Sequence, residues 1–171
     1  IVVSLESSND AYTDSLRRDF TINSIYYDYE LDKIWDFHGA KLHIANKTLA
    51  TVGSPYDRFK EDYSRILRAA YLSSALDFNT DFITGKAMQE LNYCLEKVPN
   101  ALVGKIVKKS ISSGSFHKFL AALDEYDLLS YIFPEMYHTV GLEQNPKYHQ
   151  YDVWEHTLKV VEEAEKMHKG D

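Results

Sequence analysis

The sequence predicts an α+β fold in which short strands come first and helices follow, with the change near Pro55. Two observations support this class. Residues 1–5, 33–37 and 48–53 are rich in β-branched and aromatic residues, as strands are. After Pro55, apolar residues recur three and four positions apart, which is the spacing of amphipathic helices.

The helices are expected to fill most of the remaining chain. The first is expected to run unbroken through residues 58–71, where Phe59, Ile66 and Ala70 share one apolar face. Pro99 fits the first turn of a later helix, where its missing N–H costs nothing. Residues 79–83 interrupt the pattern, and further helices are expected over residues 84–97, 99–112, 115–132 and 152–168.

Residues 17–29 fit two structures. Phe20, Ile22 and Ile25 can line one face of a helix or of a twisted strand, and we favour a helix that ends near Asp28. The acidic residues that follow, in the sequence YYDYELD, predict a solvated hairpin.

The charge of the chain restricts how it can bind nucleic acid. Its 171 residues carry a formal net charge of −7, which gives no general attraction for a polyanion. Contact with RNA therefore needs a local basic patch, for which Lys105, Lys108 and Lys109 are the candidates. A helix face that is simply solvated has the same pattern, so the sequence leaves both interpretations open.

The composition indicates an ordinary globular protein of a reducing compartment. Hydrophobic residues make up 44% of the chain and charged residues 26%. The single cysteine, Cys94, cannot form an internal disulfide. No apolar run reaches the roughly 18 residues that a membrane span needs, and no signal-peptide pattern is seen. We therefore expect a cytoplasmic protein without a membrane segment.

The most informative string is RFKEDYSRILRAAY, at residues 58–71. Residues three and four apart share a helix face, so a continuous helix places Asp62 beside Arg65. A carboxylate only accepts hydrogen bonds and a guanidinium only donates them, so the pair can bind a base edge that offers one donor next to one acceptor. Cytosine and adenine have such an edge. A solvated ion pair between Glu61 and Arg65 is the simpler interpretation of the same spacing.

A second string, LRRDFTIN at residues 16–23, precedes the first, and VGSPYDRF at residues 52–59 leads into it. This order and spacing resemble the class II tRNA nucleotidyltransferases, which comprise the CCA-adding enzymes and the bacterial poly(A) polymerases. The resemblance implies the C-terminal part of a polymerase-β-like nucleotidyltransferase head, followed by an all-α neck and body. It divides the chain into head at residues 1–54, neck and body with the nucleotide-recognition helix at residues 55–135, and the start of an HD-type or body helical domain at residues 136–171.

The resemblance also implies roles for particular residues. The expected nucleotide-binding residues are Arg18, Asp62, Arg65 and Arg68, and the expected supporting residues are Asp19, Asn23 and Glu61. The chain departs from the family pattern at several positions. Tyr71 stands where a further Arg is frequent, and Phe37, Ala40 and His43 depart from the family pattern that begins at Asp36.

The metal site of the family has no counterpart in this sequence. Nucleotidyl transfer needs Mg²⁺ held by carboxylates, which in this family form a D-x-D on a strand after a Gly-rich turn. The only comparable spacing, Asp28 and Glu30, lies after LRRDFTIN, which is the wrong order. We therefore expect the Mg²⁺ ligands to precede Ile1, and this chain alone to be inactive. His156 matches the first metal-binding His of an HD-type domain.

The function implied by the resemblance is addition of C and A from CTP and ATP to the 3′ end of tRNA, or of A alone to RNA. The motifs do not separate these two reactions. Two other functions stay open: a non-catalytic RNA-binding or interaction module on the same scaffold, and the specificity domain of an HD phosphohydrolase.

Overall fold

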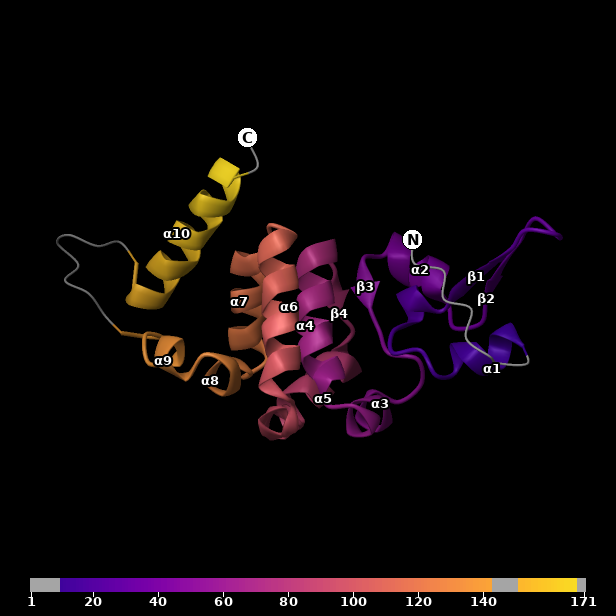
Figure 1. Ribbon diagram of the computed structural model, residues 1–171, viewed down its shortest axis with the longest axis horizontal. Helices are drawn as coiled ribbons and strands as arrows, with labels where there is room; N and C mark the ends of the chain where they lie inside the picture. Colours follow the sequence, from indigo (N-terminus) through magenta and orange to yellow (C-terminus); the bar gives the residue numbers. More distant parts are fainter. Residues whose placement is uncertain (1–9, 143–150, 169–171) are drawn as a thin grey trace.

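The computed structural model describes residues 10–142 and 151–168. The elements follow one another from a small N-terminal α+β part, through a group of packed helices, to a C-terminal helix (Figure 1). The N-terminal part contains α1 (Ala11–Ser15), the 3-10 turn η1 (Thr21–Asn23), β1 (Ile25–Asp28), β2 (Lys33–Asp36), α2 (Ala40–Ala45) and β3 (Thr48–Leu49).

The strands β1 and β2 form an antiparallel hairpin in which Ile25 pairs with Asp36 and Asp28 pairs with Lys33. The strand expected at residues 33–37 is therefore confirmed, and so is the hairpin. The helix favoured for residues 17–28 is wrong, because pairing with β2 supplies partners for the backbone that a helix would otherwise need. The strand expected at residues 1–5 lies outside the described residues.

The second part is helical, with one short exception. Strand β4 (Asn79–Thr80) lies in the predicted interruption at residues 79–83. It pairs in parallel with β3 and so connects this segment to the N-terminal part. The helical elements are α3 (Pro55–Glu61), α4 (Ser64–Leu76), α5 (Phe82–Glu90), the 3-10 segment η2 (Asn92–Lys97), α6 (Asn100–Ser112), α7 (Phe116–Glu125), α8 (Leu129–Ile132), α9 (Pro134–Tyr137) and α10 (Val153–His168).

Two of the predicted helices are divided in the structure. Residues 84–97 form α5 and the 3-10 segment η2, and residues 115–132 form α7 and α8. The second division falls at Asp127, whose φ of 56° is left-handed and ends a helix in the usual way. The helices predicted at residues 99–112 and 152–168 are confirmed as α6 and α10, each within one residue at its start.

The helix expected to run unbroken through residues 58–71 is also divided. Helix α3 ends at Glu61, Asp62 is extended with φ −153° and ψ 103°, and α4 begins at Ser64. The Asp62 Oδ1 atom accepts hydrogen bonds from Ser64 N at 2.9 Å and Ser64 Oγ at 2.7 Å. A side chain that binds the backbone two residues on competes with the helical hydrogen bonds. This local contact accounts for the break.

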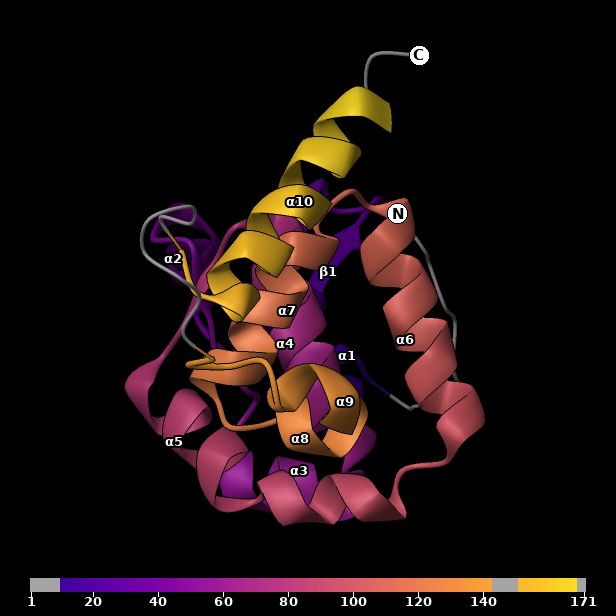
Figure 2. The ribbon, with the colours of Figure 1, turned by 90° about the vertical axis from the view of Figure 1, so that its left-hand side faces the viewer.

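One hydrophobic core connects the two parts. It includes Phe20 and Leu49 from the N-terminal part, Phe59 from α3, Leu67 from α4 and Leu123 from α7. Helix α4 is central, since it packs on both α6 and α7, and α10 packs on α7 (Figure 2). Of the helices in the described residues, none is both long enough and apolar enough to cross a membrane.

Candidate functional site

The segment that carries the LRRDFTIN motif is fixed beside the entry to α3. Thr21 N donates to Ala50 O at 2.9 Å, and Val52 N donates to Asp19 O at 3.0 Å. These bonds flank an antiparallel bridge between Phe20 and Thr51. Because the Phe20 side chain is fully buried in the core, the neighbouring motif residues have a defined orientation.

Asp19 joins this segment to α4. Its Oδ2 atom lies 2.5 Å from Arg68 Nη2, in the close approach of an ion pair. Its Oδ1 atom accepts from Phe20 N at 2.8 Å and from Asn23 Nδ2 at 3.1 Å. Asp19 is buried, whereas the Arg68 side chain is 43% exposed. Residues from two separate motifs that the sequence predicts to act together are therefore in contact.

Arg18 is held by Asp14, a residue that the sequence interpretation missed. Arg18 Nε donates to Asp14 Oδ2 at 2.9 Å, and Arg18 Nη2 forms an ion pair with the same carboxylate. Tyr26 Oη donates to Asp14 Oδ2 at 2.7 Å. The hydrogen bond with Asp14 raises the pKa of the Arg18 guanidinium. The spacing of Asp14 and Arg18, four residues apart, was the available signal.

Arg65 belongs to a second group of charged side chains, at the junction of α3 and α4. Arg65 Nη1 donates to Glu61 Oε2 at 2.7 Å and to Arg58 O at 2.9 Å. The other carboxylate oxygen of Glu61 accepts from Arg58 Nη2 at 2.8 Å. The pairing of Glu61 with Arg65 was predicted, but Arg58 was not singled out. Its spacing of three residues from Glu61 could have indicated it.

Asp62 and Arg65 do not lie on one helix, which corrects the geometry predicted for the pair. Arg65 N donates to Asp62 O at 3.0 Å, so the two residues remain within one turn. Their side chains take different protein partners, Ser64 for Asp62 and Glu61 for Arg65. Asp62 is exposed and lines a pocket of about 240 Å³ together with Lys60, Tyr63, Lys97 and Leu102, among others. The nucleotide-binding roles of both residues stay a prediction.

The segment that begins at Asp36 forms a backbone turn. Asp36 Oδ1 accepts from Ala40 N at 2.8 Å and Oδ2 accepts from Lys41 N at 2.9 Å, so the Asp36 carboxylate binds the first two backbone N–H groups of α2. Gly39 has a φ of +72°, a conformation that favours glycine. His43, which departs from the family pattern, shares a hydrogen bond of 2.8 Å between its Nδ1 atom and Thr21 Oγ1.

The three lysines proposed for RNA contact lie together on α6. Lys105, Lys108 and Lys109 are all exposed. In the part of the chain that the structure describes, none of them belongs to an ion pair with a carboxylate. Their contact with RNA stays a prediction.

The described residues do not fit a metal ion. Within residues 10–142 and 151–168, no three His, Cys, Asp or Glu side chains form a group that could hold one. Asp28 instead accepts from Glu30 N and Leu31 N, both at 3.1 Å, in the hairpin turn. His156 is exposed on α10. We therefore assign no chemical step to Mg²⁺ in this part of the chain.

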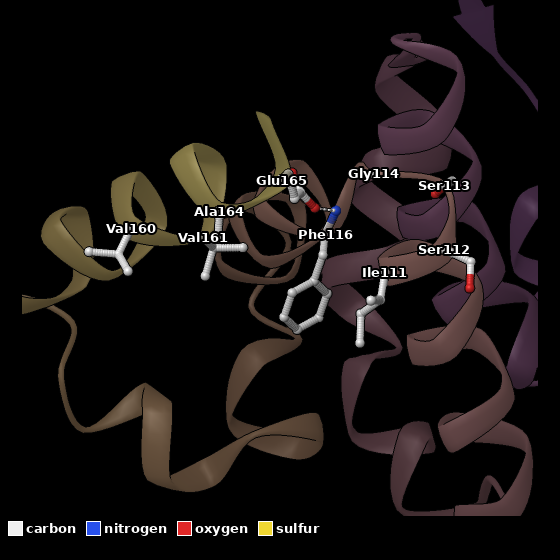
Figure 3. A pocket seen from close by; sticks show the side chains of 9 residues that line it. All are labelled: Ile111, Ser112, Ser113, Gly114, Phe116, Val160, Val161, Ala164 and Glu165. Carbon is white, nitrogen blue, oxygen red and sulfur yellow. Dashed lines mark hydrogen bonds between the residues drawn. The ribbon is translucent and has the colours of Figure 1, made fainter. Parts of the chain in front are cut away.

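A larger pocket, of about 700 Å³, is lined by the residues drawn in Figure 3. It is bounded by the end of α6, the start of α7 and one side of α10. Ile111, Phe116, Val160 and Val161 supply apolar surface, and Glu165 accepts a hydrogen bond of 2.5 Å from Phe116 N. None of the residues predicted to bind the nucleotide lines this pocket.

Acid should weaken the Asp14 cluster. Burial disfavours the ionised Asp14 carboxylate, but the hydrogen bonds from Tyr26, Arg18 and Arg17 outweigh burial and lower its pKa. A lowered pKa in the folded state adds stability above the ordinary pKa of about 3.9, and this contribution is lost as the pH falls through the folded value. Urea unfolding at pH 7 should show Asp14→Asn destabilised by about 1–3 kcal/mol, with a smaller difference from the wild type at pH 3. An equal difference at both pH values would contradict this account.

Sequence comparison relates the chain to RNA-processing enzymes. Residues 3–50 match the family model of the poly A polymerase head domain. The chain is 30% identical over 162 residues to the Multifunctional CCA protein of Haemophilus ducreyi, covering 91% of this chain and 39% of that protein. It is 30% identical over 121 residues to Poly(A) polymerase I of Salmonella typhimurium, covering 71% of this chain and 26% of that protein. The chain thus spans well under half the length of these relatives.

Structural comparison relates the chain to the same class of enzymes. The CCA-adding enzyme of Bacillus stearothermophilus, solved in complex with CTP, matches with a TM-score of 0.65 and 30% identity, over 73% of this chain and 31% of that chain. The fold class is therefore α+β with a polymerase-β-like head element, as predicted. The chain is a homologue of the CCA-adding enzymes and bacterial poly(A) polymerases.

Proposed function

We propose that this chain supplies the nucleotide-selecting part of an RNA 3′-end nucleotidyltransferase, which adds C and A to tRNA or A alone to RNA. The observation that carries the proposal is the ion pair between Asp19 and Arg68, at 2.5 Å. It joins the segment that bears Arg18 to the helix that bears Arg65, as a shared nucleotide site requires. The related enzyme solved with CTP supports CTP as one substrate.

Base selection would come from Asp62 and Arg65. In the described residues, their side-chain hydrogen bonds use Oδ1 of Asp62 and Nη1 of Arg65. Oδ2 of Asp62 can accept from the exocyclic amino group of cytosine or adenine, while Nη2 of Arg65 donates to the adjacent ring nitrogen. Uracil and guanine place an acceptor and a donor in the reverse order. Each mismatch leaves polar groups unpaired, at a cost of about 1–3 kcal/mol.

The other cations of the site would bind the ribose and phosphates. Arg18 is oriented by Asp14 and Tyr26, and its side chain is 28% exposed, so it can still contact a ligand. Arg68 keeps 43% exposure beside Asp19. Both guanidinium groups are permanently charged, which suits binding of a triphosphate. Lys105, Lys108 and Lys109 on α6 would contact the RNA substrate.

The proposed domain division follows the same scheme. Residues 1–54 would belong to the head, residues 55–135 to the neck and body, and residues 136–171 to the start of an HD-type or body helical domain. We propose that the complete protein uses Mg²⁺ bound by residues other than those described here. His156 would be the first metal ligand of the HD-type domain in the whole protein.

Nucleotide binding by the 171-residue chain tests the proposal. In an NMR titration, CTP and ATP should shift the resonances of Arg18, Asp62 and Arg65, and UTP and GTP should shift them less. Lys86→Gln, on α5, removes a cation whose ion-pair partner is Glu90, and serves as a control that should keep the same preference. Equal shifts for all four nucleotides, or shifts confined to other residues, would contradict the proposal.

The same chain should not extend RNA. Incubated with labelled CTP and ATP, Mg²⁺ and a tRNA lacking its 3′ end, it is expected to give no product, because the described residues contain no metal-binding group. Extension that disappears when Asp28 or Glu30 is replaced would show that the metal site lies in the hairpin.

A further inference from the structure

Arg58 occupies an unusual position for a charged residue. It lies in the last turns of α3, and only 17% of its side chain is exposed. Burying a guanidinium costs free energy unless its N–H groups are hydrogen-bonded. Its partners therefore indicate why an arginine stands at this position.

The two terminal nitrogens of Arg58 bind different parts of the chain. Nη1 donates to Leu16 O at 2.8 Å and approaches Arg18 O at 3.5 Å. Both carbonyls belong to the LRRDFTIN motif. Nη2 donates to Glu61 Oε1 at 2.8 Å. The planar guanidinium of Arg58 thus connects the backbone carbonyls of Leu16 and Arg18 to the carboxylate of Glu61.

Glu61 extends this connection to Arg65. Its Oε2 atom accepts from Arg65 Nη1 at 2.7 Å, so the two carboxylate oxygens serve one arginine each. Arg65 Nη1 also donates to the backbone carbonyl of Arg58 at 2.9 Å. Arg58 therefore restrains Arg65 both through its side chain and through its main chain. The side chain of Arg65 is only 16% exposed, so it is oriented by these protein contacts more than by solvent.

We propose that Arg58 is a positioning residue for base selection, a role that rests on the proposed function. By binding Glu61 it fixes the rotation of the carboxylate that orients Arg65. By binding the carbonyls of Leu16 and Arg18 it fixes the separation between Arg65 and the segment that bears Arg18. A base bound by Arg65 and a triphosphate bound by Arg18 need that separation to be constant.

A lysine cannot replace this arginine fully. The guanidinium presents several N–H groups in a rigid plane, whereas an ammonium is a single point of charge on a flexible chain. Arg58→Lys should retain a contact with either Glu61 or the Leu16 carbonyl, but not both in the same geometry. Arg58→Gln should lose the ion pair with Glu61 altogether.

Steady-state kinetics of the full-length protein with CTP, ATP and UTP test the role. The kcat/KM ratio of CTP to UTP should fall roughly three- to tenfold in Arg58→Gln and less in Arg58→Lys, as expected for the loss of about one hydrogen bond. Lys86→Gln removes a cation that pairs with Glu90 on α5 and should leave the ratio unchanged. Thermal unfolding of each variant shows whether it is folded.

The outcomes separate this inference from the proposed function. If Asp62→Ala and Arg65→Ala change the CTP to UTP ratio and folded Arg58→Gln does not, Arg58 only supports the fold. If none of the three variants changes the CTP to UTP ratio, the proposed function is contradicted, and with it the role of Arg58 that rests on it. Should Arg58→Gln not fold, Arg58→Lys decides: a folded variant with a wild-type ratio overturns the inference, and a reduced ratio supports it.

Discussion

Replacing Asp62 with Ala in the full-length protein is expected to reduce its preference for CTP and ATP over UTP and GTP by roughly tenfold to hundredfold. The variant loses the acceptor for the exocyclic amino group of cytosine and adenine. Arg65 remains and can donate to the carbonyl oxygens of uracil and guanine. Discrimination between the nucleotides should therefore fall more than overall activity does. The kcat/KM values for all four nucleoside triphosphates give the measurement.

The companion variant, Arg65→Ala, should behave differently. It removes the donor to the ring nitrogen that both cytosine and adenine present, so kcat/KM should fall for CTP and ATP alike.

Ser64→Ala is a useful control for the Asp62 variant, because it removes the hydroxyl that donates to Asp62 Oδ1 at 2.7 Å without removing the carboxylate. Wild-type base preference in Asp62→Ala would mean that Asp62 serves only to start α4.

Sequence alone was sufficient for the parts of the site that depend on local spacing. Glu61 and Arg65 are four residues apart, and they form the predicted ion pair. It was insufficient where a side chain redirects the backbone. The spacing of Phe59, Ile66 and Ala70 fits one long helix, but the hydrogen bonds from Ser64 to Asp62 divide it. Two consecutive helices that pack on one core can have the same apolar periodicity as a single helix, so the pattern could not separate them.

Contacts between distant segments were the other feature that the sequence could not predict. Ile25 and Tyr26 fit a helix or a strand, and only the pairing of β1 with β2 decides between them. The partner of Arg58 lies 42 residues away at Leu16, and its acceptor is a backbone carbonyl, which every residue possesses. No side-chain pattern could therefore identify that contact. Asp14 was accessible in principle, since its spacing to Arg18 is helical.

The link between Asp19 and Arg68 leads to the second large expected effect. Asp19→Ala should destabilise the chain by about 2–4 kcal/mol, because it leaves the buried Phe20 N without its side-chain acceptor and removes the acceptor of Asn23 Nδ2. The ion pair itself should contribute the smaller share, since Arg68 is 43% exposed and solvent screens it.

Two matched variants divide that effect in urea unfolding experiments. Asp19→Asn keeps an oxygen for Phe20 N but loses the charge, so its loss of stability should be intermediate. Arg68→Gln should cost least, because its guanidinium is the more exposed partner. The double variant Asp19→Ala with Arg68→Gln should be less destabilised than the sum of the two single changes, since residues in direct contact are not additive. Additive losses, or an Asp19→Ala variant within about 0.5 kcal/mol of the wild type, would mean that the two motifs are held together by the shared core around Phe20 and not by this pair.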